Sequence, residues 1–518
     1  MNIGTLLTRH ARYRPEHTAL VAGGKRLSYR ELNAHVNRLA NALVDAGYAK
    51  GDRMATVLGN GLELMCAYWA AAKTGVVIVP CSTLLRESGL ATLLENSGAS
   101  LVLADDAFAE TIERVCDGLE SLGRERIVLV GGGETHPELA SYSDWMAAAS
   151  DTEPPDAMLT DSDVYNIMYS SGTTGLPKGI VHTHYVRAMY CTLFASAFRF
   201  SPESVVLHAG AIVFNGAMLG IMPWMFVGCT YILERAFDAE TIIRTIERER
   251  VTHMVMVPSQ IIALLNSPSF KSEDLASLEM IQNLGAPLHL EYKNRLNEAL
   301  PGRFYELYGV TEGFVTILDR TDALRKAGSV GAPPPFFDIR IVDTDGRVCE
   351  PGEIGEICGK GPIQMSGYHG HPDLTDQAIV DGWLHTGDLG YLDEEGYLFL
   401  VDRMKDMIIS GGVNVYPKDI EEIIIRHPLV VEVAVFGVAH SRWGETPVAA
   451  VIAKQGHAID AVELVEWTNS RVDAKFQRIS DVVVMNTFPR NAAGKTLKRE
   501  LREQYVERQT AHPGDADR

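Results

Sequence analysis

A glycine- and hydroxyl-rich stretch between two apolar runs is the feature that most constrains this chain. Residues 169–179 read Tyr-Ser-Ser-Gly-Thr-Thr-Gly-Leu-Pro-Lys-Gly, between the apolar residues 164–168 and Ile180-Val181. Glycines let the backbone approach a ligand closely, and successive loop N–H groups can surround an anion. Hydroxyl donors and a lysine add polar contacts of the kind that bind phosphate. We therefore expect a strand followed by a phosphate-binding loop, with Ser170, Ser171, Gly172, Thr173, Thr174, Gly175 and Lys178 as its ligand-binding residues.

A ligand-free turn and a Walker A motif both fit this stretch less well. A ligand-free turn needs only one or two such residues, whereas four hydroxyls, three glycines and a lysine fall here within eleven positions. A Walker A motif requires Gly-Lys-Ser/Thr after four spacers, and Pro177-Lys178-Gly179 occupies that place. An ordinary P-loop NTPase is therefore disfavoured.

Length and charge set the outer bounds on fold and partners. A chain of 518 residues exceeds the roughly 250–300 residues at which single cores stop growing, so two or more domains are expected. The net charge of −20 argues against nucleic acid or an anionic membrane as the main partner. Seven cysteines without a Cys-x-x-Cys pair indicate free thiols in a reducing cytoplasm and disfavour structural zinc.

Two segments could be mistaken for targeting or membrane signals. Residues 1–15 have the pattern of a surface amphipathic helix, and no continuous apolar region follows to make a signal peptide. Ser204–Leu233 contains no Asp, Glu, Lys or Arg, but four glycines and a proline interrupt it. A spanning helix needs about 20 residues with fewer interruptions. We expect a strand, a buried helix and a strand around an internal pocket, and a cytoplasmic protein.

The remaining chain predicts an α/β fold with a separate C-terminal domain. Short apolar runs alternate with helical stretches up to about residue 310, which indicates mainly parallel sheets flanked by helices. From Asp338, short strands separated by Asp-Gly, Pro-Gly and Glu-Gly turns indicate a β-rich subdomain. A compact α+β pattern follows the charged stretch 402–412. We place the boundary at Asp402, giving domains 1–401 and 402–518, the second small and mobile.

Further candidate ligand loops follow the predicted strands. Ligands of open α/β sheets collect at the carboxyl ends of strands, where Gly285-Ala286-Pro287 and the Tyr308–Glu312 segment are expected. An aromatic ring there can stack on a base, and a carboxylate can hold Mg²⁺. Asp388 could accept hydrogen bonds from ribose hydroxyls. Lys495 follows a flexible loop and on its own would be a solvated surface charge.

Together these stretches resemble the adenylate-forming (ANL) superfamily, over nearly the whole chain and in the family's order. The phosphate loop, the adenine loop at residues 285–287, the aromatic–Gly–x–Thr–Glu motif at 308–312 and Asp388 all match. The linker Asp402-Arg403-Met404-Lys405-Asp406 and the glycine loop after it match as well. Residues 402–415, with Trp443-Gly444-Glu445, look most like the acyl-CoA synthetase branch.

The resemblance implies a role for each matching residue. ATP would be bound by the phosphate loop and by Gly285, Ala286, Pro287, Tyr308, Gly309, Asp388 and Arg403. Lys495, Thr311 and Glu312 would be catalytic, with Glu312 holding Mg²⁺, and Lys405 would be the hinge. Ser410, Gly411 and Gly412 would bind CoA, and Val213, Phe214, Asn215 and Gly313 would form the acyl pocket.

The implied reaction is an ATP-dependent ligation of a carboxylic acid to CoA that proceeds through an acyl-adenylate and releases AMP and pyrophosphate. Many family members carry a Pro-x-Phe-His pattern in the acyl pocket, and here that histidine position holds Val213 or Phe214. We therefore expect an apolar acid, either a medium- or long-chain fatty acid or an aryl acid. The alternatives are an enzyme that loads a carrier protein and a non-catalytic nucleotide-binding paralogue. A base for the CoA thiol is not evident, because His182, His184 and His208 are better explained as structural. A homodimer is a candidate assembly.

Overall fold

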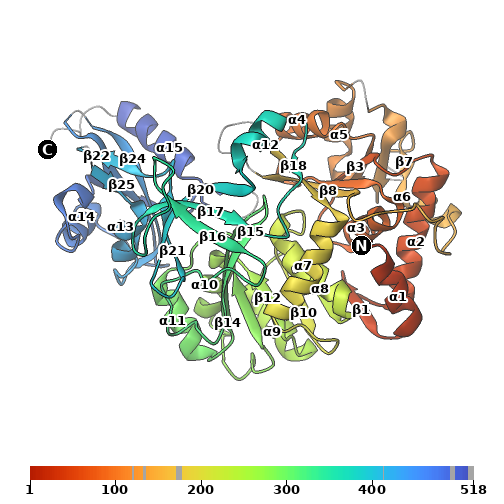
Figure 1. The fold of residues 1–518 in the computed structure, drawn as a ribbon, viewed down its shortest axis with the longest axis horizontal. Coiled ribbons are helices and arrows are strands. Elements are labelled where there is room, and N and C mark those ends of the chain that lie inside the picture. The colour runs from red at the N-terminus through yellow and green to blue at the C-terminus, as the bar shows by residue number, and fades with distance from the viewer. Residues whose placement is uncertain are drawn as a thin grey trace.

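The computed structural model describes residues 1–119, 122–131, 136–170, 178–411, 413–440, 442–490 and 496–511. Two eight-stranded sheets form the N-terminal part, a five-stranded sheet follows, and a second five-stranded sheet forms the C-terminal part (Figure 1). The predicted α/β class with a small α+β C-terminal region is confirmed.

The first large sheet carries the strand that precedes the predicted phosphate loop. Its order is β18-β9-β8-β4-β3-β5-β6-β7. The strand β8 runs parallel to β4 but antiparallel to β9, so the loop 171–177 joins neighbouring antiparallel strands rather than a strand and a helix. The bounds are β3 (Arg53–Val57), β4 (Val77–Pro80), β5 (Leu101–Asp105), β6 (Ile127–Val130), β7 (Ala140–Ser141), β8 (Val164–Ser170), β9 (Lys178–Thr183) and β18 (Gly367–Tyr368).

The second large sheet has a parallel centre and antiparallel edges. Its order is β15-β14-β13-β12-β10-β11-β1-β2, and only β2 and β15 pair antiparallel. The bounds are β1 (Thr18–Ala22), β2 (Lys25–Ser28), β10 (Val205–His208), β11 (Thr230–Leu233), β12 (His253–Met256), β13 (Met280–Asn283), β14 (Phe304–Val310) and β15 (Phe314–Leu318).

Three largely buried helices, α3, α7 and α8, share a hydrophobic cluster with residues of both large sheets. The helix α8 is apolar on all sides, as expected of a core helix. It is part of the uncharged segment 204–233, which forms the predicted strand, buried helix and strand. No helix among the described residues is long and apolar enough to cross a membrane. The helices of this part are α1 (Thr5–Tyr13), α2 (Tyr29–Asp45), α3 (Leu62–Thr74), α4 (Glu87–Ser97), α5 (Ala109–Cys116), α6 (Tyr142–Ala148), α7 (His184–Ala197), α8 (Met218–Val227), α9 (Ala239–Glu249), α10 (Pro258–Asn266) and α11 (Leu290–Ala299).

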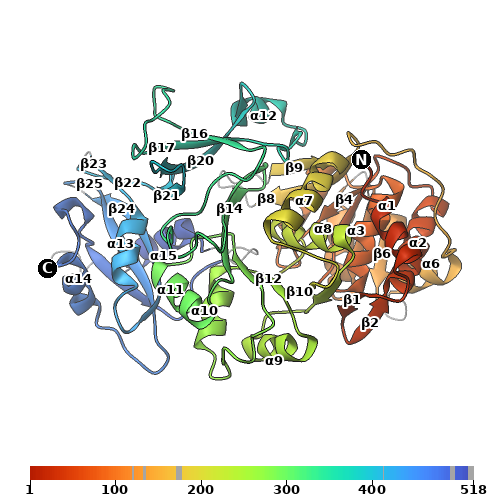
Figure 2. The same cartoon turned by 60° about the horizontal axis from the view of Figure 1, so that its bottom comes forward.

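The two smaller sheets follow in sequence. The predicted β-rich subdomain is antiparallel and lies with α12 (Pro372–Ala378) above the other layers in Figure 2. Its strands are β16 (Asp338–Val342), β17 (Gly355–Lys360), β19 (Ile379–Val380), β20 (Trp383–Leu392) and β21 (Leu398–Arg403). The C-terminal part contains β22 (Ile408–Ser410), β23 (Val413–Val415), β24 (Val430–His440), β25 (Gly444–Ala453), β26 (Asp481–Met485), α13 (Pro417–Ile424), α14 (Ala461–Asn469) and α15 (Lys498–Ala511). The predicted boundary at Asp402 falls near the end of β21 and stays a prediction.

Candidate active site

A cleft of about 1950 Å³ lies where the carboxyl ends of β10, β12, β13 and β14 face residues of the β-rich subdomain and of α15. Carboxyl ends of parallel strands are the usual ligand sites of open α/β sheets. The structure brings most of the described site residues that the sequence predicts together in its lining: Lys178, Val213, Phe214, Asn215, Gly285, Gly309, Thr311, Glu312, Asp388, Arg403 and Lys405.

Asp388 is held from two sides. The Tyr308 hydroxyl on β14 donates to its Oδ2 at 2.9 Å, and the Arg403 Nε lies 3.5 Å from its Oδ1. Asp388 and Arg403 are also register partners on β20 and β21. Burial and the neighbouring Asp388 raise the pKa of Tyr308, so the tyrosine stays a hydrogen-bond donor. The carboxylate is therefore preorganised, as binding a ribose would require.

Glu312 and Lys178 meet at one aromatic ring. The Tyr368 hydroxyl donates to Glu312 Oε1 at 2.8 Å, and the Lys178 Nζ lies 4.9 Å from the centroid of the Tyr368 ring. The second carboxylate oxygen of Glu312 accepts no hydrogen bond from the described residues. A free carboxylate oxygen suits a hard cation such as Mg²⁺, and a lysine beside it suits a phosphate.

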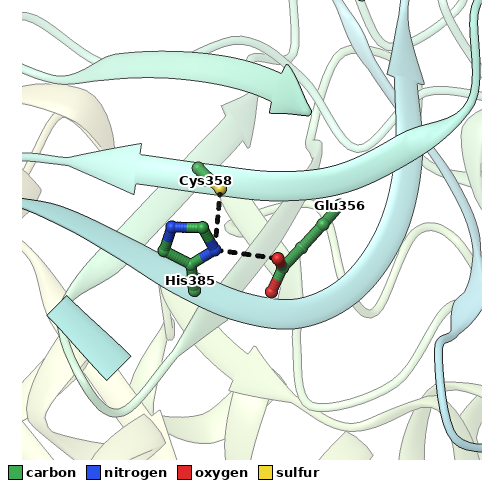
Figure 3. A group of neighbouring side chains, drawn as sticks. All are labelled: Glu356, Cys358 and His385. Atoms are coloured by element: carbon green, nitrogen blue, oxygen red, sulfur yellow. Dashed lines mark hydrogen bonds and ion pairs between the residues drawn. The ribbon is translucent and has the colours of Figure 1, made fainter. Parts of the chain in front are cut away.

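A Glu–Cys–His group supports the turn before Asp388 (Figure 3). The imidazole Nδ1 of His385 lies 2.8 Å from Glu356 Oε2 and 3.4 Å from Cys358 Sγ. The other oxygen of Glu356 accepts from the Gly387 N–H at 3.0 Å, and Gly387 has a φ of 71°, which favours glycine. The ligand atoms of the three side chains lie within 4.8 Å of one another, as metal ligands do. Hydrogen bonds already account for their arrangement, so we interpret the group as a support for the turn.

The end of the cleft near α7 and α8 contains no charge. Between Tyr190 and Thr311, none of the described lining residues is Asp, Glu, Lys or Arg. Burial lowers the pKa of His208 to about 4, so its imidazole is neutral near pH 7. Gly313 does not line the cleft, and a Cβ there would lie 2.2 Å from the Ile363 carbonyl oxygen.

Other predicted residues lie elsewhere or outside the described chain. Ala286, Pro287, Ser410 and Gly411 do not line the cleft, and the Gly411 N–H donates to the Trp443 carbonyl at 2.7 Å. Tyr308 does not line the cleft either, but its hydroxyl holds Asp388, which does. The side chain of Ser170 and the residues Ser171, Gly172, Thr173, Thr174, Gly175, Gly412 and Lys495 are outside the described part of the structure.

The C-terminal part nevertheless contributes to the cleft. Arg490, the last described residue before segment 491–495, lines it and forms an ion pair with Glu432. Arg490 and Thr496 pair in an isolated β-bridge, so the described residues on either side of that segment lie next to each other. Lys405 lines the cleft too. The lining residues that the sequence did not reveal include Tyr190, Glu356, Tyr368, His385 and Arg490, because none of them belongs to a sequence motif with a known chemical role.

Comparison with known proteins identifies the family. A model of the AMP-binding enzymes matches residues 7–369, and one of the AMP-binding enzyme C-terminal domain matches residues 419–495. The chain belongs to this adenylate-forming family. Feruloyl-CoA synthase of Amycolatopsis sp. is 36% identical over 97% of this chain and 99% of its own. A long-chain-fatty-acid–CoA ligase of Mycobacterium tuberculosis is 34% identical over 97% of this chain and 98% of its own. The chain is accordingly an AMP-forming acid–CoA ligase.

Solved structures show the same fold and indicate its conformation. The ATP-bound crystal structure of MatB from Rhodopseudomonas palustris is 30% identical, covers 98% of this chain and 99% of its own, and has a TM-score of 0.88. The apo structure of the same protein has a TM-score of 0.78 and covers 97% of this chain and 98% of its own. This ligase therefore resembles the ATP-bound arrangement more closely than the apo arrangement.

Proposed function

We propose that this ligase activates an apolar monocarboxylic acid, either a fatty or an aryl acid, and transfers it to CoA. The observation that carries the proposal is the uncharged lining of the cleft between Tyr190 and Thr311. A second carboxylate or an ammonium group buried there would have no charged partner among the described residues, and burying an unpaired charge is costly. The acids in the names of the two relatives, feruloyl and long-chain fatty, support the same class.

In the first step the acid carboxylate attacks the α-phosphorus of ATP, and pyrophosphate leaves. Two anions approach each other, so positive charge is needed where negative charge develops. Lys495 would supply it between the carboxylate and the α-phosphate, and Lys178 would bind the departing pyrophosphate. Asp388, held by Tyr308 and Arg403, would bind the ribose.

Mg²⁺ bound with ATP would offset phosphate charge, and Glu312 would be its protein ligand through the carboxylate oxygen that Tyr368 does not occupy. In the second step the CoA thiol attacks the acyl carbonyl and AMP leaves. Ser410, Gly411 and Gly412 would serve this step after the C-terminal domain rotates, since the described residues of that loop lie outside the cleft lining in the present arrangement.

A CoA-ligation screen tests the proposal. Apolar monocarboxylates should exceed dicarboxylates and α-amino acids in kcat/KM by at least roughly tenfold, which corresponds to ~1.4 kcal/mol. AMP release should require CoA and should not occur with a carrier protein instead. A clear preference for malonate or for an α-amino acid would contradict the proposal.

A further inference from the structure

A buried arginine lies behind the acyl end of the cleft without an acidic partner among the described residues. Arg187 on α7 has no exposed surface. It donates to Asn166 Oδ1 at 2.8 Å, to Asn215 Oδ1 at 2.9 Å and to His182 Nδ1 at 3.1 Å. A buried cation is costly unless its N–H groups are paired, and here neutral side chains pair them.

The chemistry of arginine fixes the direction of each hydrogen bond in this network. Arginine only donates, so Asn215 turns its carbonyl oxygen toward Arg187 and its amide group toward Tyr190. The Asn215 Nδ2 lies 3.0 Å from the Tyr190 hydroxyl oxygen, which therefore accepts. His182 accepts at Nδ1 in the same way, so its proton is on Nε2, which donates to the Thr311 carbonyl at 2.9 Å.

The hydroxyl hydrogen of Tyr190 is then left over. Its oxygen accepts from Asn215, and no described residue accepts the hydrogen. Tyr190 and Asn215 both line the cleft, within the part of the lining that contains no charged residue. A hydroxyl in an apolar wall is the donor that a ligand oxygen would satisfy, because an unpaired buried donor is costly.

The charge of Arg187 makes the Tyr190 hydroxyl a stronger hydrogen-bond donor. Hydrogen bonds in a chain polarise one another, and the effect is larger in a low-dielectric interior. The positive charge of Arg187 polarises the Asn215 amide, and the amide in turn polarises the Tyr190 hydroxyl. The guanidinium carbon also lies 4.8 Å from the centroid of the Tyr190 ring, which keeps the ring in place.

We propose that Tyr190 is a specificity-determining residue that donates a hydrogen bond to an oxygen of the acid other than its carboxylate. Arg187 is a positioning residue that acts through Asn215. The preferred substrates are apolar acids with a neutral oxygen substituent, such as an aryl acid with a hydroxyl or methoxy group. A second carboxylate is disfavoured, because Asn215 stands between the cleft and the only cation of this network. This inference rests on the proposed function and narrows its substrate class.

The test compares matched acids with and without the oxygen. The panel pairs cinnamate with its ring-hydroxylated and ring-methoxylated forms, and straight-chain fatty acids with their hydroxylated forms. Wild-type protein should favour the oxygenated member of at least one pair by roughly fivefold or more in kcat/KM, the order of one net hydrogen bond. Tyr190→Phe should bring that ratio close to one, mainly by slowing the oxygenated acid.

Tyr165→Phe is the matched control. Tyr165 is also fully buried, but its hydroxyl donates to the Tyr68 carbonyl at 3.2 Å and it does not line the cleft. This variant should keep the wild-type ratio. A second measurement uses the wild-type enzyme alone. An acyl-sulfamoyl-adenosine whose acyl group carries the hydroxyl or methoxy substituent should inhibit the enzyme more strongly than the analogue whose acyl group lacks it.

The outcomes separate this inference from the proposed function. Equal loss of kcat/KM for both members of every pair in Tyr190→Phe would mean that the hydroxyl binds the carboxylate end, and would overturn the inference. The inference would also be overturned if the wild-type enzyme had the same kcat/KM for both members of every pair. In either case apolar acids would still be ligated, so the proposed function would stand. Preference for dicarboxylates would instead defeat the proposed function.

Discussion

At the residue scale, the proposed nucleotide site depends on Asp388 and on the Tyr308 hydroxyl that donates a hydrogen bond to it. The Tyr308 hydroxyl reaches Asp388 from β14, on a different sheet from the β20 strand that carries the carboxylate. Hydrogen bonds to charged groups contribute about 1.5–3 kcal/mol. We expect Tyr308→Phe to raise the KM for ATP by roughly tenfold in the pyrophosphate-exchange assay. Tyr391→Phe, on β20 and stacked on Phe399, should leave it unchanged. An unaltered KM in Tyr308→Phe would show that Asp388 is held adequately without this hydroxyl.

A second residue-scale prediction concerns Lys495, which only the family resemblance assigns. Arg490, which precedes its segment, lines the cleft and pairs with Thr496, which follows that segment. Removing one group that stabilises developing charge usually costs 10²-fold or more, so Lys495→Ala should slow adenylation by at least ~10²-fold. Thioester formation from supplied acyl-adenylate should be largely spared. Lys475→Ala, outside the cleft lining, is the control. Equal loss in both half-reactions would indicate a structural lysine instead.

At the element scale, the strands and helices with a clear apolar pattern were predictable, and the polar elements were not. The apolar runs 127–130 and 481–485 and the helical patterns 62–74 and 239–249 predict β6, β26, α3 and α9 with the bounds that the structure has. The helix α15 was missed, because it is polar nearly all round and buries Leu501 as its main apolar contact. The amphipathic pattern of residues 1–15 includes Tyr13 among its apolar residues, but the structure leaves this side chain 63% exposed.

A further element-scale prediction concerns the linker after β21. The Asp406 N–H donates to the Arg403 carbonyl at 3.0 Å, which makes residues 403–406 a turn with Lys405 in its third position. Proline fixes φ near −65° and restricts the residue before it, so Lys405→Pro limits rearrangement here. We expect Lys405→Pro to depress thioester formation strongly while pyrophosphate exchange is retained if the adenylation conformation tolerates proline. Lys405→Ala should affect both steps mildly. Wild-type thioester formation in a folded Lys405→Pro protein would show that the chain does not pivot at this residue.

At the scale of the whole molecule, only the site residues that belong to sequence motifs could be predicted. Lys178, Glu312, Asp388 and Arg403 are distant in sequence, yet the structure places all four in one cleft. Tyr368 and the Glu356–His385 pair carry no motif signal, because their roles arise from contacts across the fold. The Arg187–Asn215–Tyr190 network could not be predicted either, since it depends on how α7 packs beside the uncharged part of the cleft lining.

The last prediction, also for the whole molecule, is a loss of stability on mild acidification. Burial lowers the pKa of His184, His208 and His253 to about 4 each, and burial and then Arg187 lower that of His182 well below its ordinary value. An unfolded histidine titrates near 6.5. Below that pH the unfolded chain binds protons that the folded chain does not, so the free energy of unfolding falls as pH falls.

The size and origin of this loss can be measured. Each such histidine should cost about 1 kcal/mol between pH 6.5 and 5.5. Asp105, Asp402 and Asp419, whose pKa burial raises, act in the opposite direction, because their folded forms bind protons at a higher pH than their unfolded forms. Urea unfolding at pH 7.5, 6.5 and 5.5 should show a fall of several kcal/mol over the second interval and roughly a third of that fall over the first. His253→Gln should be less stable at neutral pH, because the imidazole Nε2 hydrogen-bonds the Phe198 carbonyl at 3.0 Å, yet its pH dependence should be shallower by one histidine. A free energy of unfolding that stayed constant or rose toward pH 5.5 would mean that these imidazoles become protonated within the fold.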